Sequence, residues 1–120
     1  MPSISFFVEG RPYAKQSFRF TKGGYSYQTS NVKNWQRTVS ICAKEVYRGD
    51  LLNEDVTVGL DFVYSGAGAD LDNFCKAVID GLQGSIFVND RKVVGLFATK
   101  RKHQGSETLG VQIRIDYGNI

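Results

Sequence analysis

Alternating hydrophobic and polar positions predict four β-strands, spread over the beginning, middle and end of the chain. Large apolar side chains occupy every second position over 4–8, 56–64 and 109–117, and a fourth, less regular run covers 93–99. A two-residue period is the pattern of a strand that buries one face and leaves the other in water. The chain therefore carries at least one sheet with a buried side.

Two segments change to the helical period. Apolar residues recur every three or four positions from Val32 to Val46, after polar residues at 29–31 that offer capping oxygens. A second run extends from Leu71 to Leu82 and follows a glycine-rich loop. Both segments predict amphipathic helices that pack on the sheet.

The remaining segments are a hairpin and a loop. Aromatic and basic side chains over 17–28 flank Lys22-Gly23-Gly24, which predicts a hairpin, and the basic segment 100–105 predicts a loop between the last two strands. Together the elements predict one α+β domain over residues 1–120. We expect a mixed β-sheet of about four to six strands packed with two main helices.

The composition is that of a soluble protein. With 120 residues, 42% of them hydrophobic, the chain can bury one core and is short for two domains. No apolar stretch has the length needed to cross a bilayer, so we expect a cytoplasmic protein that binds no membrane. Cys42 and Cys75 fall at apolar positions of the predicted helices without CxxC spacing, so we expect reduced, structural thiols.

Charge is distributed in three blocks. Residues 1–48 hold eight basic and two acidic side chains, 49–90 hold one basic and eight acidic, and 91–120 hold six basic and two acidic. Carboxylates attract metal cations and lysine or arginine attracts phosphate, so an acidic segment between two basic ones favours a metal site within a nucleic-acid surface. Ordinary clustering of surface charge is the alternative.

Three aspartates are the candidate metal ligands. Asp70 and Asp72 stand two positions apart before and within the second predicted helix, a spacing that points side chains the same way in extended backbone. Asp90 would join them if the strand after it pairs beside the strand ending at Tyr64. Mg²⁺ takes one or two carboxylates with water and phosphate, and lowers the pKa of an attacking water. Lys76 would add a positive charge near the scissile phosphate.

Simpler roles are open for the same residues. Asp70 or Asp72 would serve as a helix cap, Asp72 and Lys76 as a surface ion pair, and Asp90 as a turn residue. Asp80, one turn after Lys76, is expected to position that lysine. The chain lacks the residues of an EF-hand, a P-loop or a dinucleotide fingerprint, so we expect no nucleotide cofactor.

A family resemblance favours the catalytic interpretation. The run Asp70-Leu71-Asp72-Asn73-x-x-Lys76-x-x-x-Asp80-x-Leu82, followed by Asn89-Asp90-x-x-Val93-Val94, resembles the motif of the RusA family of Holliday-junction resolvases. The resemblance implies a homodimeric, Mg²⁺-dependent endonuclease, with Mn²⁺ a possible substitute, that cuts four-way DNA symmetrically in recombination and repair. Such proteins are often encoded by phages and prophages.

The resemblance also implies roles for individual residues. Asp70, Asp72 and Asp90 become the metal ligands, and Lys76 the essential lysine. Supporting roles fall to Asn73, Asp80 and Asn89. Many members have a second acid where this chain has Asn89, so a fourth ligand there would be an amide.

Basic side chains on both sides of the acidic block are the candidate DNA contacts. Gly10-x-Pro12-x-x-Lys15 with Arg19 is similar to the basic N-terminal stretch of many relatives. A duplex presents a charge every ~1.7 Å, so a small nuclease needs an extended basic surface, which a homodimer doubles. The expected contacts to branched DNA are Lys15, Arg19, Lys22, Lys33, Arg37, Lys100, Arg101 and Lys102.

Two other functions fit parts of the sequence. Asp90-Arg91-Lys92 satisfies the D-x-K element of PD-(D/E)xK nucleases, although the upstream acid would then be Asp80 on a helix. A non-catalytic DNA-binding or recombination-accessory protein would use the acidic cluster only to organise a loop. Cleavage of a four-way junction separates an enzyme from a binder.

Overall fold

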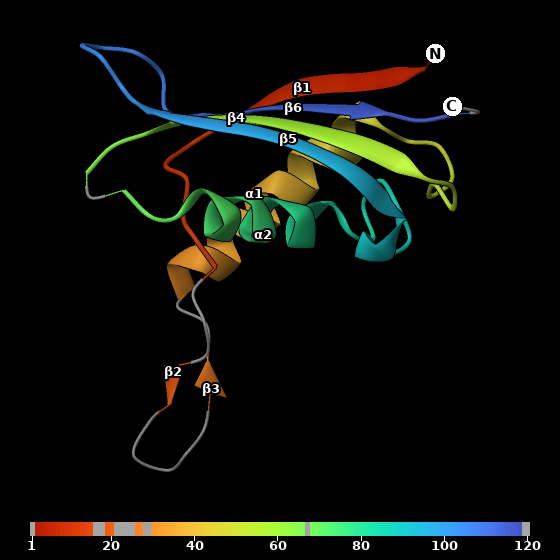
Figure 1. Cartoon of the computed structure of the whole chain (residues 1–120), viewed down its shortest axis with the longest axis horizontal. Helices are drawn as coiled ribbons and strands as arrows, with labels where there is room; N and C mark the ends of the chain where they lie inside the picture. The colour runs from red at the N-terminus through yellow and green to blue at the C-terminus, as the bar shows by residue number, and fades with distance from the viewer. Residues whose placement is uncertain (1, 16–18, 21–25, 28–29, 67, 119–120) are drawn as a thin grey trace.

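The computed structural model is a four-stranded mixed sheet with both long helices on one face (Figure 1). It describes residues 2–15, 19–20, 26–27, 30–66 and 68–118. The sheet strands are β1 (Ser3–Glu9), β4 (Val56–Tyr64), β5 (Val93–Lys102) and β6 (Gly110–Asp116). The helices are α1 (Ser30–Val46), α2 (Leu71–Leu82) and the 3₁₀ turn η1 (Asp90–Lys92). The α+β prediction is therefore confirmed.

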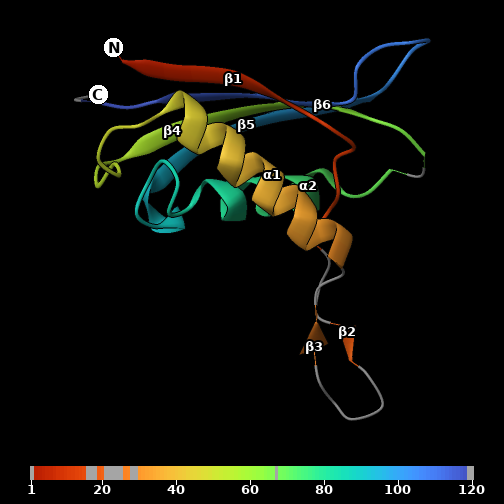
Figure 2. The ribbon, with the colours of Figure 1, turned by 180° about the vertical axis from the view of Figure 1, so that it is seen from behind.

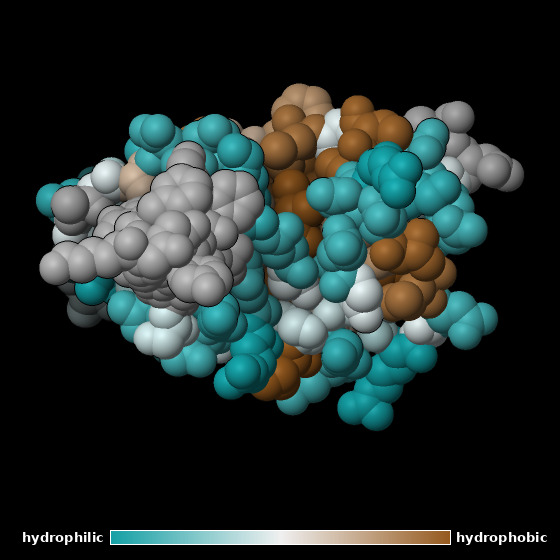
Figure 3. Space-filling view, turned by 90° about the horizontal axis from the view of Figure 1, so that it is seen from below, coloured by the Kyte–Doolittle hydropathy of each residue, from teal (hydrophilic) through white to brown (hydrophobic). Residues whose placement is uncertain are grey.

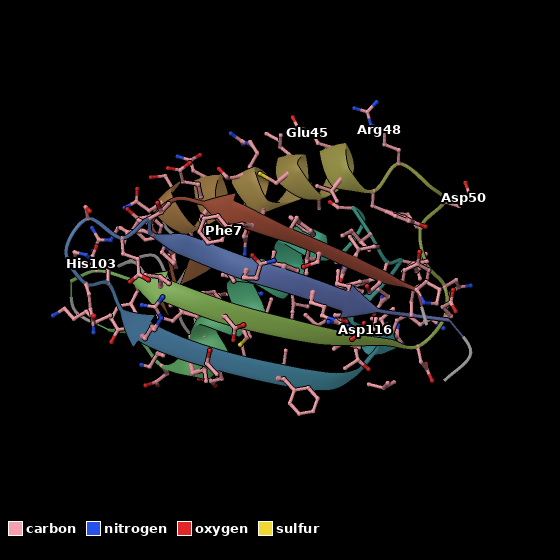
Figure 4. All side chains as sticks on the ribbon, turned by 90° about the horizontal axis from the view of Figure 1, so that it is seen from above. Phe7, Glu45, Arg48, Asp50, His103 and Asp116 are labelled. Atoms are coloured by element: carbon pink, nitrogen blue, oxygen red, sulfur yellow. The ribbon has the colours of Figure 1, made fainter. Side chains whose placement is uncertain are left out.

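The strand order of the sheet is β1-β6-β4-β5, so β1 and β5 are its edges. β6 runs antiparallel to both β1 and β4, whereas β4 and β5 run parallel and are joined by α2. Figure 4 shows the four strands in this order from above, with Phe7 and Asp116 on the face that no helix covers. Parallel neighbours need a crossover connection, and α2 supplies it.

A single core lies between the other face of the sheet and the helices. Alternate residues of β1 and β4 point inward, as their two-residue period predicts, and Val8, Val58 and Leu60 are at most 1% exposed. The rings of Phe62 on β4 and Phe74 on α2 stack with their centroids 5.2 Å apart. This contact fixes the start of α2 against the end of β4.

The two helices cross closely at Gly81. α1 lies across α2 beneath the sheet, as Figure 2 shows from behind. Gly81 is buried, and a Cβ at this position would lie 2.8 Å from the carbonyl oxygen of Gln36 and 3.0 Å from Cβ of Val39. Only a glycine lets the two backbones approach this far.

Gly81→Ala is therefore expected to lower the free energy of unfolding by about 1–3 kcal/mol through overpacking. Gly59→Ala on β4 is the matched control, because a Cβ there meets nothing closer than 3.9 Å, at Arg114. Urea denaturation of both variants measures the difference. Equal stability of the two variants would contradict the close helix crossing.

The prediction of a loop over residues 100–105 is wrong for its first three residues. Lys100, Arg101 and Lys102 continue β5, pairing in parallel with Phe62, Val63 and Tyr64. These basic side chains are exposed on an edge strand, so no hydrophobic alternation reveals the strand in the sequence. Charged edges of this kind protect a sheet from unwanted pairing.

The predicted hairpin is present in its described residues. β2 (Arg19–Phe20) pairs antiparallel with β3 (Ser26–Tyr27), and Figure 1 shows this pair away from the four-stranded sheet. The expected turn, Lys22-Gly23-Gly24, lies outside the described residues.

Both cysteines are free, as expected; Cys75 is buried, as the sequence predicts, whereas Cys42 is only half-buried. Burial raises the pKa of the Cys75 thiol to about 11, and burial also raises the pKa of the Cys42 thiol. A thiol that holds its proton is a weak nucleophile and a weak metal ligand.

Among the helices that the structure describes, none has the length and apolar character to span a membrane.

Candidate active site

Asp70 stands directly before α2, yet its carboxylate does not cap the helix. Its backbone is extended, with φ −62° and ψ 139°, and its side chain makes no capping hydrogen bond. The backbone carbonyl of Asp70 instead accepts from the N–H groups of Asn73 (3.1 Å) and Phe74 (3.2 Å). The exposed carboxylate is thus left for another ligand, which weakens the helix-cap interpretation.

Asp72 lies in the first turn of α2 and faces Lys76 one turn later. Lys76 Nζ is 3.8 Å from Asp72 Oδ2, and the two side chains are 61% and 70% exposed. An exposed ion pair of this kind contributes about 0–1 kcal/mol, so it yields readily to a stronger ligand. The surface ion pair between Asp72 and Lys76, which the sequence left open as an alternative, is therefore present. Both side chains remain accessible to solvent and to a ligand.

Asp90 lines a pocket of about 360 Å³ between α2 and β5. The α2 side of the pocket carries Lys76, Ile79 and Asp80, and the β5 side is formed by residues 93–96. The N–H of Asp90 donates to Gln83 Oε1 at 3.0 Å, which ties η1 to the end of α2. Lys76 and Asp90 therefore face one cavity from different elements.

Asn89 supports the turn that presents Asp90. Its side-chain oxygen Oδ1 accepts from the N–H of Arg91 at 2.9 Å and so caps η1. Asn89 lines a different pocket, of about 330 Å³, which it shares with Asn53, Asp55 and Arg91 among others. The supporting role implied for Asn89 thus has a geometric basis in the turn.

The three aspartates do not gather within one chain. The expected pairing of β5 beside β4 is present, but it is parallel, with Val93 opposite Val56 and Lys102 opposite Tyr64. Asp90 precedes β5 at one end of this pair, whereas Asp70 follows β4 at the other. In the sequence, the 12 residues of α2 lie between them.

Accordingly, no group of three acidic, histidine or cysteine side chains in the described part of the chain is placed to hold a metal ion. The expectation that all three aspartates converge in a single chain is not met, because the α2 crossover separates the two ends of the β4–β5 pair. The donor chemistry still suits Mg²⁺, which prefers carboxylate oxygens and needs only one or two of them. Asp70 and Asp72 form one such set, and Asp90 stands apart.

Lys15 belongs to the same region. Its Nζ lies 2.6 Å from Asp80 Oδ2, and its backbone N–H donates to the carbonyl of Asn73 at 3.0 Å. Gln36 Nε2 on α1 approaches the same Asp80 oxygen at 3.4 Å. The sequence predicted Lys15 as a DNA contact and Asp80 as a partner of Lys76. No spacing rule in the sequence indicates the ion pair across 65 positions.

The other predicted DNA contacts occupy several surfaces. Lys33 and Arg37 are exposed on α1, and Lys102 is exposed at the end of β5. Lys100 Nζ donates to the carbonyl of Ala69 at 2.5 Å, and Arg101 pairs with Glu107, whose pKa this hydrogen bond lowers. Lys22 and the side chain of Arg19 lie outside the described residues.

Comparison with protein families identifies the chain. The model of the family described as endodeoxyribonuclease RusA matches residues 9–116, which include every candidate residue of the pocket and of the N-terminal end of α2. A comparison with curated proteins gave no match. Because the family model covers most of the 120 residues, the chain belongs to the RusA family of endodeoxyribonucleases.

Proposed function

We propose that this endodeoxyribonuclease resolves four-way DNA junctions by paired, symmetric, Mg²⁺-dependent nicks during recombination and repair. The observation that carries the proposal is the position of Lys76. It pairs weakly with Asp72 on one side and lines the pocket of Asp90 on the other. A phosphate beside Lys76 would therefore lie near the carboxylate of Asp72.

We propose further that the enzyme works as a homodimer whose sites are composite. Asp70, Asp72 and Asp90 form no metal-holding group within the described part of one chain, so Asp70 and Asp72 of one copy would act with Asp90 of the other. β5 supplies a surface for association. Val94, Leu96 and Phe97 are 60%, 46% and 74% exposed, and apolar side chains gather along this edge of the molecule (Figure 3). Exposed apolar patches typically mark protein–protein surfaces.

Each residue has a distinct task in this proposal. The carboxylates of Asp70, Asp72 and Asp90 would hold Mg²⁺, which supplies a water of lowered pKa and stabilises charge on the phosphate oxygens. Lys76 neutralises the negative charge that develops on the phosphate in the transition state. Gln83 and Asn89 fix the η1 turn and thereby the direction of Asp90.

A synthetic four-way junction tests the function directly. With Mg²⁺ or Mn²⁺, we expect symmetric nicks in two opposing strands, and without a divalent ion we expect binding without cleavage. A linear duplex of the same sequence is the control for junction selectivity. Band shifts without nicks would make the chain a binder, and equal cleavage of the linear duplex would make it a general nuclease.

The PD-(D/E)xK alternative loses support in the fold. Its D-x-K element would be Asp90-Arg91-Lys92, but these residues form the 3₁₀ turn η1 before β5 rather than part of a strand. Its upstream acid, Asp80, is paired with Lys15. The junction assay therefore needs to separate only a resolvase from a general nuclease or a binder.

A further inference from the structure

Asp80 has two lysines within its reach and binds only one of them. Lys15 Nζ is 2.6 Å from Asp80 Oδ2, and these side chains are 35% and 31% exposed. Lys76 stands one helical turn before Asp80 and lines the same pocket, yet its ion pair is with Asp72. Side chains four residues apart on a helix can meet, so Lys76 and Asp80 are potential partners.

Lys15 is held in place by two contacts with α2. Its backbone N–H is bonded to the carbonyl of Asn73 in the first turn of α2, and its amine reaches down that helix to Asp80. Gln36 on α1 contacts the same oxygen of Asp80. The N-terminal segment is thereby held beside the pocket, with the ammonium group of Lys15 directed at a carboxylate.

We propose that Lys15 is a positioning residue, which occupies Asp80 so that the ammonium group of Lys76 stays available to the phosphate. The inference rests on the proposed nuclease function. In that function Asp72 binds the metal ion, and Asp80 is a carboxylate of the same pocket that Lys76 can reach from one helical turn away. An unpaired Asp80 would draw the ammonium group of Lys76 toward itself and away from the phosphate, and Lys15 prevents this.

Charge-removing variants test the assignment by suppression. Lys15→Met is expected to lower kcat for junction cleavage about fivefold. In this variant Lys76 would form an ion pair with Asp80 instead of contacting the phosphate, and fivefold is the effect expected of one partly exposed ion pair. Asp80→Asn alone should lower kcat less than Lys15→Met does, because Lys76 then has no competing carboxylate. The double variant Lys15→Met/Asp80→Asn should recover the activity that Lys15→Met loses. Lys44→Met, which removes an exposed lysine from the last turn of α1, is the matched control.

Two other roles for Lys15 give different patterns. If Lys15 contacts DNA, Lys15→Met weakens junction binding and the second substitution restores nothing. If the ion pair only stabilises the fold, Asp80→Asn is as damaging as Lys15→Met, and both lower the melting temperature. Either pattern would overturn the proposal, and junction affinity and melting temperature are measured alongside kcat.

A readout without catalysis separates this inference from the proposed function. In the Asp72→Asn protein, the side-chain ¹⁵Nζ signal of Lys76, assigned by its loss in Lys76→Arg, reports whether the ammonium is bonded. Adding Lys15→Met should shift that signal, and adding Asp80→Asn as well should return it. An unchanged signal contradicts the role of Lys15 whether or not the protein cleaves junctions. A shifted and restored signal, together with a wild-type protein that cleaves no four-way junction, would contradict only the proposed function.

Discussion

Asp72→Asn is expected to reduce four-way junction cleavage by about three orders of magnitude while leaving junction binding intact or tighter. The substitution removes a charged ligand at the N-terminal end of α2 and keeps the size of the side chain. Binding should persist because the lost charge is negative and repels phosphate. Single-turnover cleavage and a band-shift titration in Ca²⁺ measure the two effects separately.

Asp50→Asn is the matched control for this variant. Asp50 is an exposed aspartate beyond the end of α1, and Figure 4 shows it at the rim of the molecule near Arg48. Its loss removes the same charge at a distance from α2, so cleavage should remain at the wild-type rate. A fully active Asp72→Asn protein would remove Asp72 from the mechanism.

Strands and helices were predictable wherever one face is buried. The inward residues of β1 and β4 and the apolar stripe of α2 follow their expected periods, and burial is what imposes those periods. The end of β5 carries Lys100 to Lys102 on an exposed edge, where no burial constrains the pattern. The end of a strand on an exposed sheet edge therefore cannot be located from the hydrophobic pattern of the sequence.

The sequence predicts which residues belong to the candidate site. It does not predict how these residues lie relative to one another in space. The motif around Asp70, Asp72 and Lys76 is local, so its helical geometry follows from spacing alone. The distance to Asp90 depends on whether β5 pairs parallel or antiparallel with β4, which the sequence of β5 does not reveal. The Lys15–Asp80 pair likewise depends on where the N-terminal segment crosses α2.

Mixing two inactive variants is expected to restore activity if the sites are composite. We expect Asp72→Asn and Asp90→Asn homodimers each to be inactive, since every site in them lacks a ligand. A heterodimer of the two has one site that combines both substitutions and one site with all its aspartates intact. This heterodimer should nick a junction at about half the wild-type rate, because one of two equivalent sites works. Paired symmetric cuts should be absent.

The heterodimer is obtained by co-expression with two different tags and tandem purification, and size-exclusion chromatography establishes its mass. A mixture of Asp70→Asn with Asp72→Asn is the control, because these residues lie at the same end of α2 and no combination of them yields an intact site. Sites contained within single chains predict that both mixtures stay inactive. In that case Asp90 and the N-terminal end of α2 would have to approach each other by movement within one chain, and the dimer would serve only to match the symmetry of the junction.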